Sequence, residues 1–133
     1  MFEQTVTPRF YETDASGHVN NTVVTGWFET GRAPLFQLFG GGRNPASLPL
    51  ILARVEVDFV AQIYYGSDVT LRTGIERIGN SSFVVTQQAW QNGALVARGR
   101  AVQVYFDHEK QASAPVPDAF REELARHEGV LPE

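Results

Sequence analysis

The second half of the chain contains four strand-like segments separated by tight turns, and this succession restricts the fold more than any other feature. The predicted strands are residues 54–60, 69–78, 83–91 and 95–106, and the turns between them are 66–68, 79–81 and 92–93. Asn92 and Gly93 both tolerate a positive φ, as a two-residue hairpin requires. Consecutive strands joined by tight turns pair antiparallel, so the sequence predicts an antiparallel sheet.

Alternation of apolar residues indicates which side of each strand is buried. It is clearest in the first two of the four strands. The residues that share one face are Val55, Val57 and Phe59 in the first, and Val69, Leu71, Thr73 and Ile75 in the second.

A helix is predicted over residues 21–39, where Val24, Trp27, Phe28, Leu35 and Leu38 recur at helical spacing. Pro34 lacks an N–H and would clash with the preceding turn, so a kink or a restart is expected there. Gly26 costs roughly 1 kcal/mol in a helix interior, and we expect it to permit close approach of the sheet or of a bound acyl chain. Gly40–Gly42 should end the helix, before a loop through Asn44–Pro45 to Pro49.

Two shorter elements complete the chain. Residues 4–10 alternate weakly and predict a short strand, and residues 117–127 predict a C-terminal helix. The order is strand, long helix and four strands, and it is typical of an α+β fold in which the helix covers one face of a curved sheet. Its 133 residues, without an internal repeat, suit one domain spanning 1–133.

Composition excludes several classes of function. The net charge is -4 and the basic residues are scattered, so a nucleic-acid partner is not expected. The chain has no cysteine, which excludes disulfides and a thiolate nucleophile and fits a cytoplasmic protein. No signal peptide and no apolar run of membrane-spanning length is visible, so no membrane partner is expected.

The stretch Tyr11–Asn21 gathers an acid, a glycine, a histidine and two asparagines just before the predicted helix. Asn20 or Asn21 is a good N-cap, because its side chain can accept from the free N–H groups of the first turn. Those N–H groups can polarise a carbonyl, while the Asp14 carboxylate attacks it or activates water. The stretch therefore predicts an acyl-transfer site.

Simpler interpretations of the same residues stay open. Asp14 alone could be an Asx-turn residue that accepts from nearby backbone N–H groups. His18 could orient the loop or donate to Asp14, and a metal site is disfavoured because the motif holds no third ligand. Glu29 is expected on an exposed helix face or in an ion pair with Arg32.

The chain resembles the hotdog-fold acyl-CoA thioesterases, specifically the 4-hydroxybenzoyl-CoA thioesterase-like family. Residues 13–21 are similar to that family's Asp-x-x-Gly-His-Val-Asn-Asn signature. The other matching segments, in the family's order over roughly residues 4–108, are Trp27-Phe28-Glu29-x-x-Arg32, Val57–Phe59, Tyr65–Val69, Ile78–Phe83 and Leu95–Arg100.

The resemblance implies a five-stranded antiparallel sheet wrapped around the long helix, with the short helix at the C-terminus. It also implies a homodimer or homotetramer with the active site at the subunit interface. Asp14 would be nucleophile or general base, the N–H of Asn21 would polarise the thioester carbonyl, and His18 is the third catalytic candidate. No metal and no cofactor is expected, apart from the CoA of the substrate.

The resemblance also suggests residues that contact the acyl-CoA. Gly17 and Asn20 shape the loop, Val57 and Phe59 belong to a matching strand, and the turn after the second strand borders CoA. Arginines are candidates for the nucleotide phosphates. The remaining residues of this set are Gly79, Ser81, Ser82, Arg77, Arg98 and Arg100.

The sequence thus predicts an acyl-CoA thioesterase that releases a free acid and CoA. The alternatives are a non-catalytic acyl-thioester binding module on the same fold, a thioesterase for acyl carrier protein, and a hotdog hydratase or dehydratase. Acyl length, aromatic preference, dimer or tetramer, and nucleophile or base for Asp14 stay open.

Overall fold

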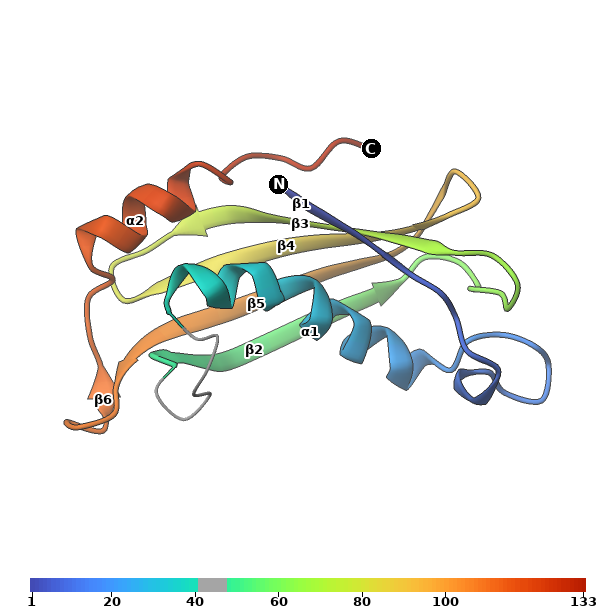
Figure 1. The fold of residues 1–133 in the computed structure, drawn as a ribbon, viewed down its shortest axis with the longest axis horizontal. Coiled ribbons are helices and arrows are strands. Elements are labelled where there is room, and N and C mark those ends of the chain that lie inside the picture. The colour runs from blue at the N-terminus through green and yellow to red at the C-terminus, as the bar shows by residue number, and fades with distance from the viewer. Residues whose placement is uncertain (41–47) are drawn as a thin grey trace.

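The structure is a computed structural model that describes residues 1–40 and 48–133. A long helix, α1, lies across one face of an antiparallel sheet, and a short helix, α2, lies at one end of the sheet (Figure 1). The helices are α1 (Asn21–Leu38) and α2 (Asp118–Ala125), and a 3-10 turn covers Phe10–Glu12. The strands are β1 (Phe2–Val6), β2 (Leu50–Phe59), β3 (Val69–Ile78), β4 (Ser82–Gln91), β5 (Ala94–Asp107) and β6 (Ala112–Ser113).

The predicted α+β hotdog arrangement is confirmed. Five strands run in the order β1-β3-β4-β5-β2, every neighbouring pair is antiparallel, and the two-residue β6 adds to β5. The hairpin at Asn92-Gly93 is also confirmed, since φ is 51° at Asn92 and 77° at Gly93. Because the order places β2 at one edge, one side of β2 has no partner strand within the described residues.

Strand ends differ from the prediction where the alternation is broken. The first strand was expected to reach Phe10, but β1 ends at Val6 and Phe10 begins the 3-10 turn. Pro8 has no N–H to donate to a neighbouring strand, which explains the early end. β2 begins at Leu50 instead of residue 54, because a bulge between Leu52 and Arg54 shifts the register and hides the period.

The expected restart at Pro34 is wrong, because α1 continues through Pro34 as one helix to Leu38. Buried residues on both sides of the proline hold the helix against the sheet. The predicted glycine end is seen at Gly40, with a φ of 74°. The rest of that prediction, Gly41–Gly42 and Asn44–Pro45, lies outside the described residues.

The core fills the space between α1 and the facing side of the sheet. All four residues predicted on one face of β3, Val69, Leu71, Thr73 and Ile75, are buried. Phe28 of α1 is fully buried and lies over Gly99 of β5, where an added Cβ would come within 2.8 Å of its ring. Gly26 does not bring the sheet close, since the space around its missing Cβ is open.

A buried polar cluster fastens the middle of α1 to the sheet. The Gln87 amide in β4 donates to the carbonyl oxygen of Phe28 at 2.8 Å and to the Thr73 hydroxyl at 3.1 Å. The Arg32 guanidinium donates in turn to Gln87 Oε1 at 3.1 Å. Because buried polar groups are costly when unpaired, these bonds favour one position of α1 on the sheet.

Two alanine substitutions test this packing. Gly99→Ala should lower the free energy of unfolding by about 1–3 kcal/mol, because its Cβ would overlap the Phe28 ring in a filled core. Gly26→Ala should raise it by up to about 1 kcal/mol, because alanine favours the helix and meets no neighbour. Urea denaturation measures both, and equal effects of the two variants would contradict the described packing.

Candidate active site

The segment between the 3-10 turn and α1 forms a narrow loop closed by backbone hydrogen bonds. Asp14 N donates to His18 O at 2.8 Å, and Gly17 N donates to Asp14 O at 3.1 Å. Gly17 has a φ of 83°, so the sharp turn predicted there needs the freedom of glycine. The loop is tied to the segment after β2 by a bond from Val19 N to Ile63 O at 2.7 Å.

Asp14 holds this loop together with only one of its carboxylate oxygens. Oδ1 accepts from Ser16 Oγ at 2.7 Å, from Ser16 N at 2.9 Å and from His18 N at 3.3 Å. The bonds from the Ser16 hydroxyl and backbone N–H lower the pKa of Asp14, and those from His18 add to the effect. No donor of a described residue reaches Oδ2, so one oxygen of an ionised carboxylate is open to chemistry.

The first turn of α1 lies directly after this loop. Asn20 is the N-cap, and its Oδ1 accepts from Thr22 N at 3.0 Å and from the Thr22 hydroxyl at 2.9 Å. Asn21 is the first helical residue, and its N–H has no acceptor among the described residues. It is therefore a free donor at the positive end of the helix dipole.

A cavity of about 530 Å³ brings the carboxylate and the helix start together. Its lining residues are Asp14, Val19, Asn20, Asn21, Val24, Phe59, Val60, Ala61, Gln62 and Ile63. Asp14, Asn20, Asn21 and Phe59 were predicted from the sequence, whereas Val60–Ile63, the run after Phe59, were not. The continuation of the matching strand could have indicated them, because a strand that ends beside the Asp14 loop brings the next residues there too.

His18 contacts neither the cavity nor the carboxylate with its ring. The imidazole lies edge-on to Tyr64, with ring centroids 5.0 Å apart, and its Nδ1 is 3.2 Å from Ser16 Oγ. Ser16 in turn bonds Asp14, so the hydrogen bonds of the ring reach the carboxylate through that hydroxyl. This geometry fits the loop-orienting alternative better than a direct proton transfer.

The Asp14 side chain is exposed in the single chain. A carboxylate acts more strongly on a substrate where it is partly buried, because its charge is then less screened by water. The same cavity is flanked by Phe59 and Val60, with 52% and 46% of their surface exposed. These apolar side chains are near the open edge strand, so a partner chain or a substrate could cover this part of the site.

The arginines chosen for phosphate binding lie elsewhere. Arg98 and Arg100 flank Gly99, which faces Phe28, so their side chains are on the side of β5 away from α1. They line a separate cavity of about 360 Å³ between the sheet and residues 128–133. Arg77 is exposed on β3.

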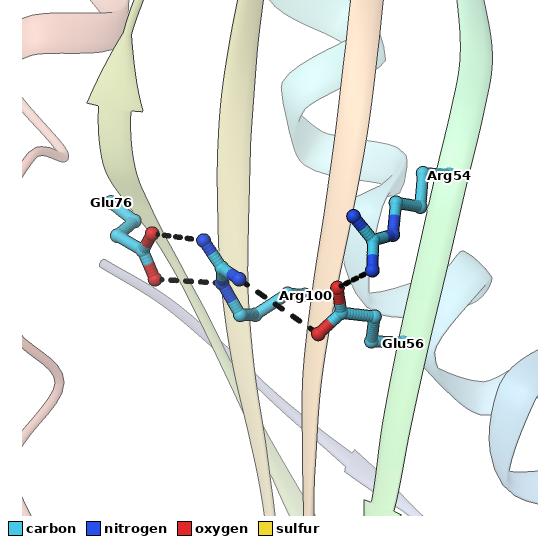
Figure 2. A network of polar contacts seen from close by, with 4 residues as sticks. All are labelled: Arg54, Glu56, Glu76 and Arg100. Carbon is cyan, nitrogen blue, oxygen red and sulfur yellow. Dashed lines mark hydrogen bonds and ion pairs between the residues drawn. The ribbon is translucent and has the colours of Figure 1, made fainter.

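Arg98 and Arg100 are already paired with carboxylates of the same chain. Arg100 bonds Glu76 at 2.6 and 3.1 Å and lies 3.8 Å from Glu56, which also pairs with Arg54 at 2.7 Å (Figure 2). The Glu76 carboxylate raises the pKa of the Arg100 guanidinium. Arg98 pairs with Glu133 at 3.1 Å. Phosphate binding by Arg77, Arg98 and Arg100 stays a prediction.

The turn between β3 and β4 also lies apart from the loop that holds Asp14. It is beside α2, whereas the loop is at the opposite end of the sheet (Figure 1). Gly79 N donates to Ser82 O at 2.7 Å, and Arg121 of α2 donates to the carbonyl oxygen of Gly79 at 3.0 Å. Ser81 O accepts from Tyr105 N at 2.8 Å. CoA contacts by Gly79, Ser81 and Ser82 stay a prediction.

Val57 packs against the core cluster under the first half of α1, on the strand that leads to Phe59.

Within residues 1–40 and 48–133, no three His, Asp or Glu side chains gather as a metal site would need. None of the helices in these ranges combines the length and apolar character that crossing a membrane takes.

The chain is similar to known proteins in sequence and in fold. The family model described as the thioesterase-like superfamily matches residues 8–124. A predicted thioesterase from Bacillus stearothermophilus has a solved structure with 44% identity and a TM-score of 0.93, over 98% of each chain. A thioesterase from Thermus thermophilus, complexed with coenzyme A and Zn, has 30% identity and a TM-score of 0.82, over 92% of this chain and 95% of its own. The 1,4-dihydroxy-2-naphthoyl-CoA hydrolase of Synechococcus sp. (strain CC9605) is 29% identical, over 84% of this chain and 81% of its own.

The hydrogen bonds to Asp14 predict a lowered pKa, which an experiment can measure. In an NMR titration of the carboxyl carbon, Asp14 should titrate below an ordinary aspartate. Ser16→Ala removes the hydroxyl that contributes most, so the midpoint should rise toward the ordinary value. Thr22→Ala, which alters the cap but not the bonds of Asp14, serves as the control. An unchanged midpoint in Ser16→Ala would show that the described bonds do not set this pKa.

Proposed function

Since the chain belongs to the thioesterase-like superfamily, we propose that it hydrolyses an acyl-CoA thioester to the free acid and CoA. The observation that carries the proposal is that Asp14, which has an open carboxylate oxygen, and Asn21, which has a free N–H, line one cavity. A carbonyl held there meets a carboxylate on one side and a positive helix terminus on the other.

In the proposed reaction, the N–H of Asn21 binds the carbonyl oxygen and stabilises the charge that develops on it. A donor of this kind is typically worth about 10²–10³ in rate. Asp14 attacks the carbonyl carbon or removes a proton from a water that attacks it. The carbon–sulfur bond then breaks, and CoA leaves as a thiolate that takes up a proton. After attack by Asp14 the acyl group remains on the carboxylate as a mixed anhydride, which water hydrolyses to the free acid and the restored carboxylate.

The lowered pKa bears on which of these two roles Asp14 has. A carboxylate that is ionised well below neutral pH is available as a nucleophile, but it is a weak base. We therefore favour attack by Asp14 Oδ2. Single-turnover hydrolysis in water labelled with heavy oxygen separates the routes, because only attack by the carboxylate can carry the label into Asp14.

CoA as the carrier is supported by a relative. The Thermus thermophilus protein, 30% identical, is complexed with coenzyme A. An acyl carrier protein is acidic and would favour a basic rim, but the residues lining the cavity include no lysine or arginine. The proposed mechanism assigns each step to the protein's own groups and invokes no metal or redox cofactor.

We also propose that the working form is a homodimer or homotetramer in which the β2 edges of two subunits meet. Ile51, Leu52 and Val55 of this strand expose 39%, 44% and 39% of their surface, an unusual share for a free edge. Pairing would bury these side chains and place a second subunit beside the exposed carboxylate of Asp14.

The first prediction from this proposal concerns the carboxylate. Asp14→Asn should lower kcat for acyl-CoA hydrolysis by about 10³-fold or more, because an amide neither attacks nor accepts the proton. The amide oxygen can still accept the three loop hydrogen bonds, so the melting temperature should change little. Release of free thiol from short, medium, long and aromatic acyl-CoAs measures the turnover.

Asp58→Asn, on the side of β2 away from α1, is the matched control and should keep full activity. Activity near wild type in Asp14→Asn would remove Asp14 from the mechanism. Binding of CoA compounds without any thiol release would favour the non-catalytic module. A change in alkene absorbance without thiol release would favour a hydratase or dehydratase.

The second prediction concerns assembly. Val55→Lys places a charge on the edge of β2 and should convert the assembled protein to monomers, because a buried unpaired charge opposes edge pairing. Light scattering after gel filtration measures the mass of each variant. Val130→Lys changes an exposed valine of the C-terminal segment and should leave the mass unaltered. A wild-type protein that is itself monomeric would refute the proposed interface.

A further inference from the structure

The cavity at Asp14 lies between the first turn of α1 and the end of β2, where it is bordered by Asn21 and by Phe59, the last residue of β2. A second cavity, of about 260 Å³, lies where α1 ends and β2 begins. Its lining residues are Glu29, Arg32, Phe36, Leu48, Leu50, Leu52 and Gln103. Half-buried Val57 and exposed Val55 lie on β2 between the two cavities.

Arg32 is the unusual member of this second cavity. Only 2% of its surface is exposed, although it carries a charge that is rarely buried without a partner. One terminal nitrogen donates to Gln87. The Nε–H, also buried, has no hydrogen-bond partner in the part of the chain that the structure describes.

The expected ion pair between Glu29 and Arg32 does not satisfy that donor. No oxygen of Glu29 is among the ion-pair partners within 4.0 Å in the described residues, and Glu29 is exposed. Burial lowers the pKa of Arg32, and the nearby Glu29 charge opposes this effect. Arg32 lines a cavity whose other walls are mainly leucine and phenylalanine, and its Nε–H is buried behind that wall without a partner. A small shift of the guanidinium would let this donor meet an oxygen that enters with an apolar group.

We propose that this second cavity binds the distal end of the acyl group, and that Arg32 donates to a neutral oxygen there, a hydroxyl or a ketone. The inference rests on the proposed function and specifies its substrate class. The acyl chain would lie between α1 and β2, with its thioester carbonyl at Asn21 and its oxygen at Arg32.

The helix gives the length of such a substrate. Asn21 and Arg32 are eleven residues apart, about 16 Å along the axis of α1. Side chains on a helix lean toward its N-terminus, so the distance to be bridged is shorter, on the order of 10 Å. A saturated chain of roughly eight to ten carbons spans it.

Charge favours a neutral oxygen over a carboxylate. The Glu29 carboxylate borders the same cavity and would repel a second anion. A hydroxyl can accept from Arg32 while its own proton faces Glu29 or water, and a ketone only needs to accept.

The test compares decanoyl-CoA with ω-hydroxydecanoyl-CoA, two substrates that differ only in the distal oxygen. Wild-type protein should cleave the hydroxylated substrate with a kcat/KM about tenfold higher or more, because only this oxygen satisfies the buried donor. Arg32→Met, of similar shape without donors, should bring the ratio of the two values to about one. Arg32→Lys keeps a cation without the Nε–H and should also lower the ratio.

Arg126→Met, at an exposed arginine of the C-terminal region, is the control and should keep the wild-type ratio. Circular dichroism shows whether each variant is folded. If Arg32→Met does not fold, the comparison uses Arg32→Lys alone. Equal kcat/KM values for both substrates in the wild type, or an unchanged ratio in a folded Arg32 variant, would overturn the inference. So would faster cleavage of the matching ω-carboxy substrate.

Butanoyl-CoA is too short to reach Arg32 and separates this inference from the function on which it rests. Asp14-dependent thiol release from butanoyl-CoA, together with a flat ratio for the longer pair, would refute only the role of Arg32. Absence of Asp14-dependent release from every substrate would refute the proposed function and the inference together.

Discussion

The hydrogen bonds of Gln87 fix the position of α1, and the rest of the site depends on that position. Apolar packing alone would let a helix slide or turn over a sheet at modest cost, but buried amide and carbonyl groups allow few alternatives. Gln87 bonds the helix backbone at Phe28, a side chain of β3 and a side chain of α1. The helix is held by these bonds at its middle and by the cap at Asn20 at its start, so Asn21 stays beside the cavity that Asp14 lines.

The second constraint is the unpaired edge of β2. Strand order leaves it at the border of the sheet, and its apolar side chains remain exposed there. The cavity at Asp14 and the cavity at Arg32 are both bordered by this strand or by the residues that follow it. A second subunit at the edge would therefore complete the walls of both cavities at once, which connects assembly with substrate binding.

Sequence reasoning succeeded where a local pattern had one physical cause. The bounds of β3 followed from the alternation over Val69–Ile75 and from the turn residues on either side, although a bulge interrupts the register between Ile75 and Arg77. A cap at Asn20 or Asn21 followed from side-chain chemistry, and the structure places it at Asn20. It failed where two distant elements decide the outcome. The start of β2 is obscured by a bulge that only pairing with β5 reveals. The face of β5 that carries Arg98 and Arg100 is likewise decided by packing, because small residues at alternate positions turn toward α1 and leave both arginines on the opposite face. Their phosphate contacts stay a prediction.

The division of work within the Asp14 carboxylate has a consequence for divergence. One oxygen maintains the loop and the other is left open for the proposed reaction, so exchange of a single atom would separate the two roles. A lineage that abandons hydrolysis but keeps the binding site can exchange the acid for its amide and retain the loop. A lineage that replaces Asp14 by a smaller residue without a side-chain oxygen loses both the loop hydrogen bonds and the open oxygen. Asparagine at this position is therefore the expected mark of descendants that bind thioesters without cleaving them.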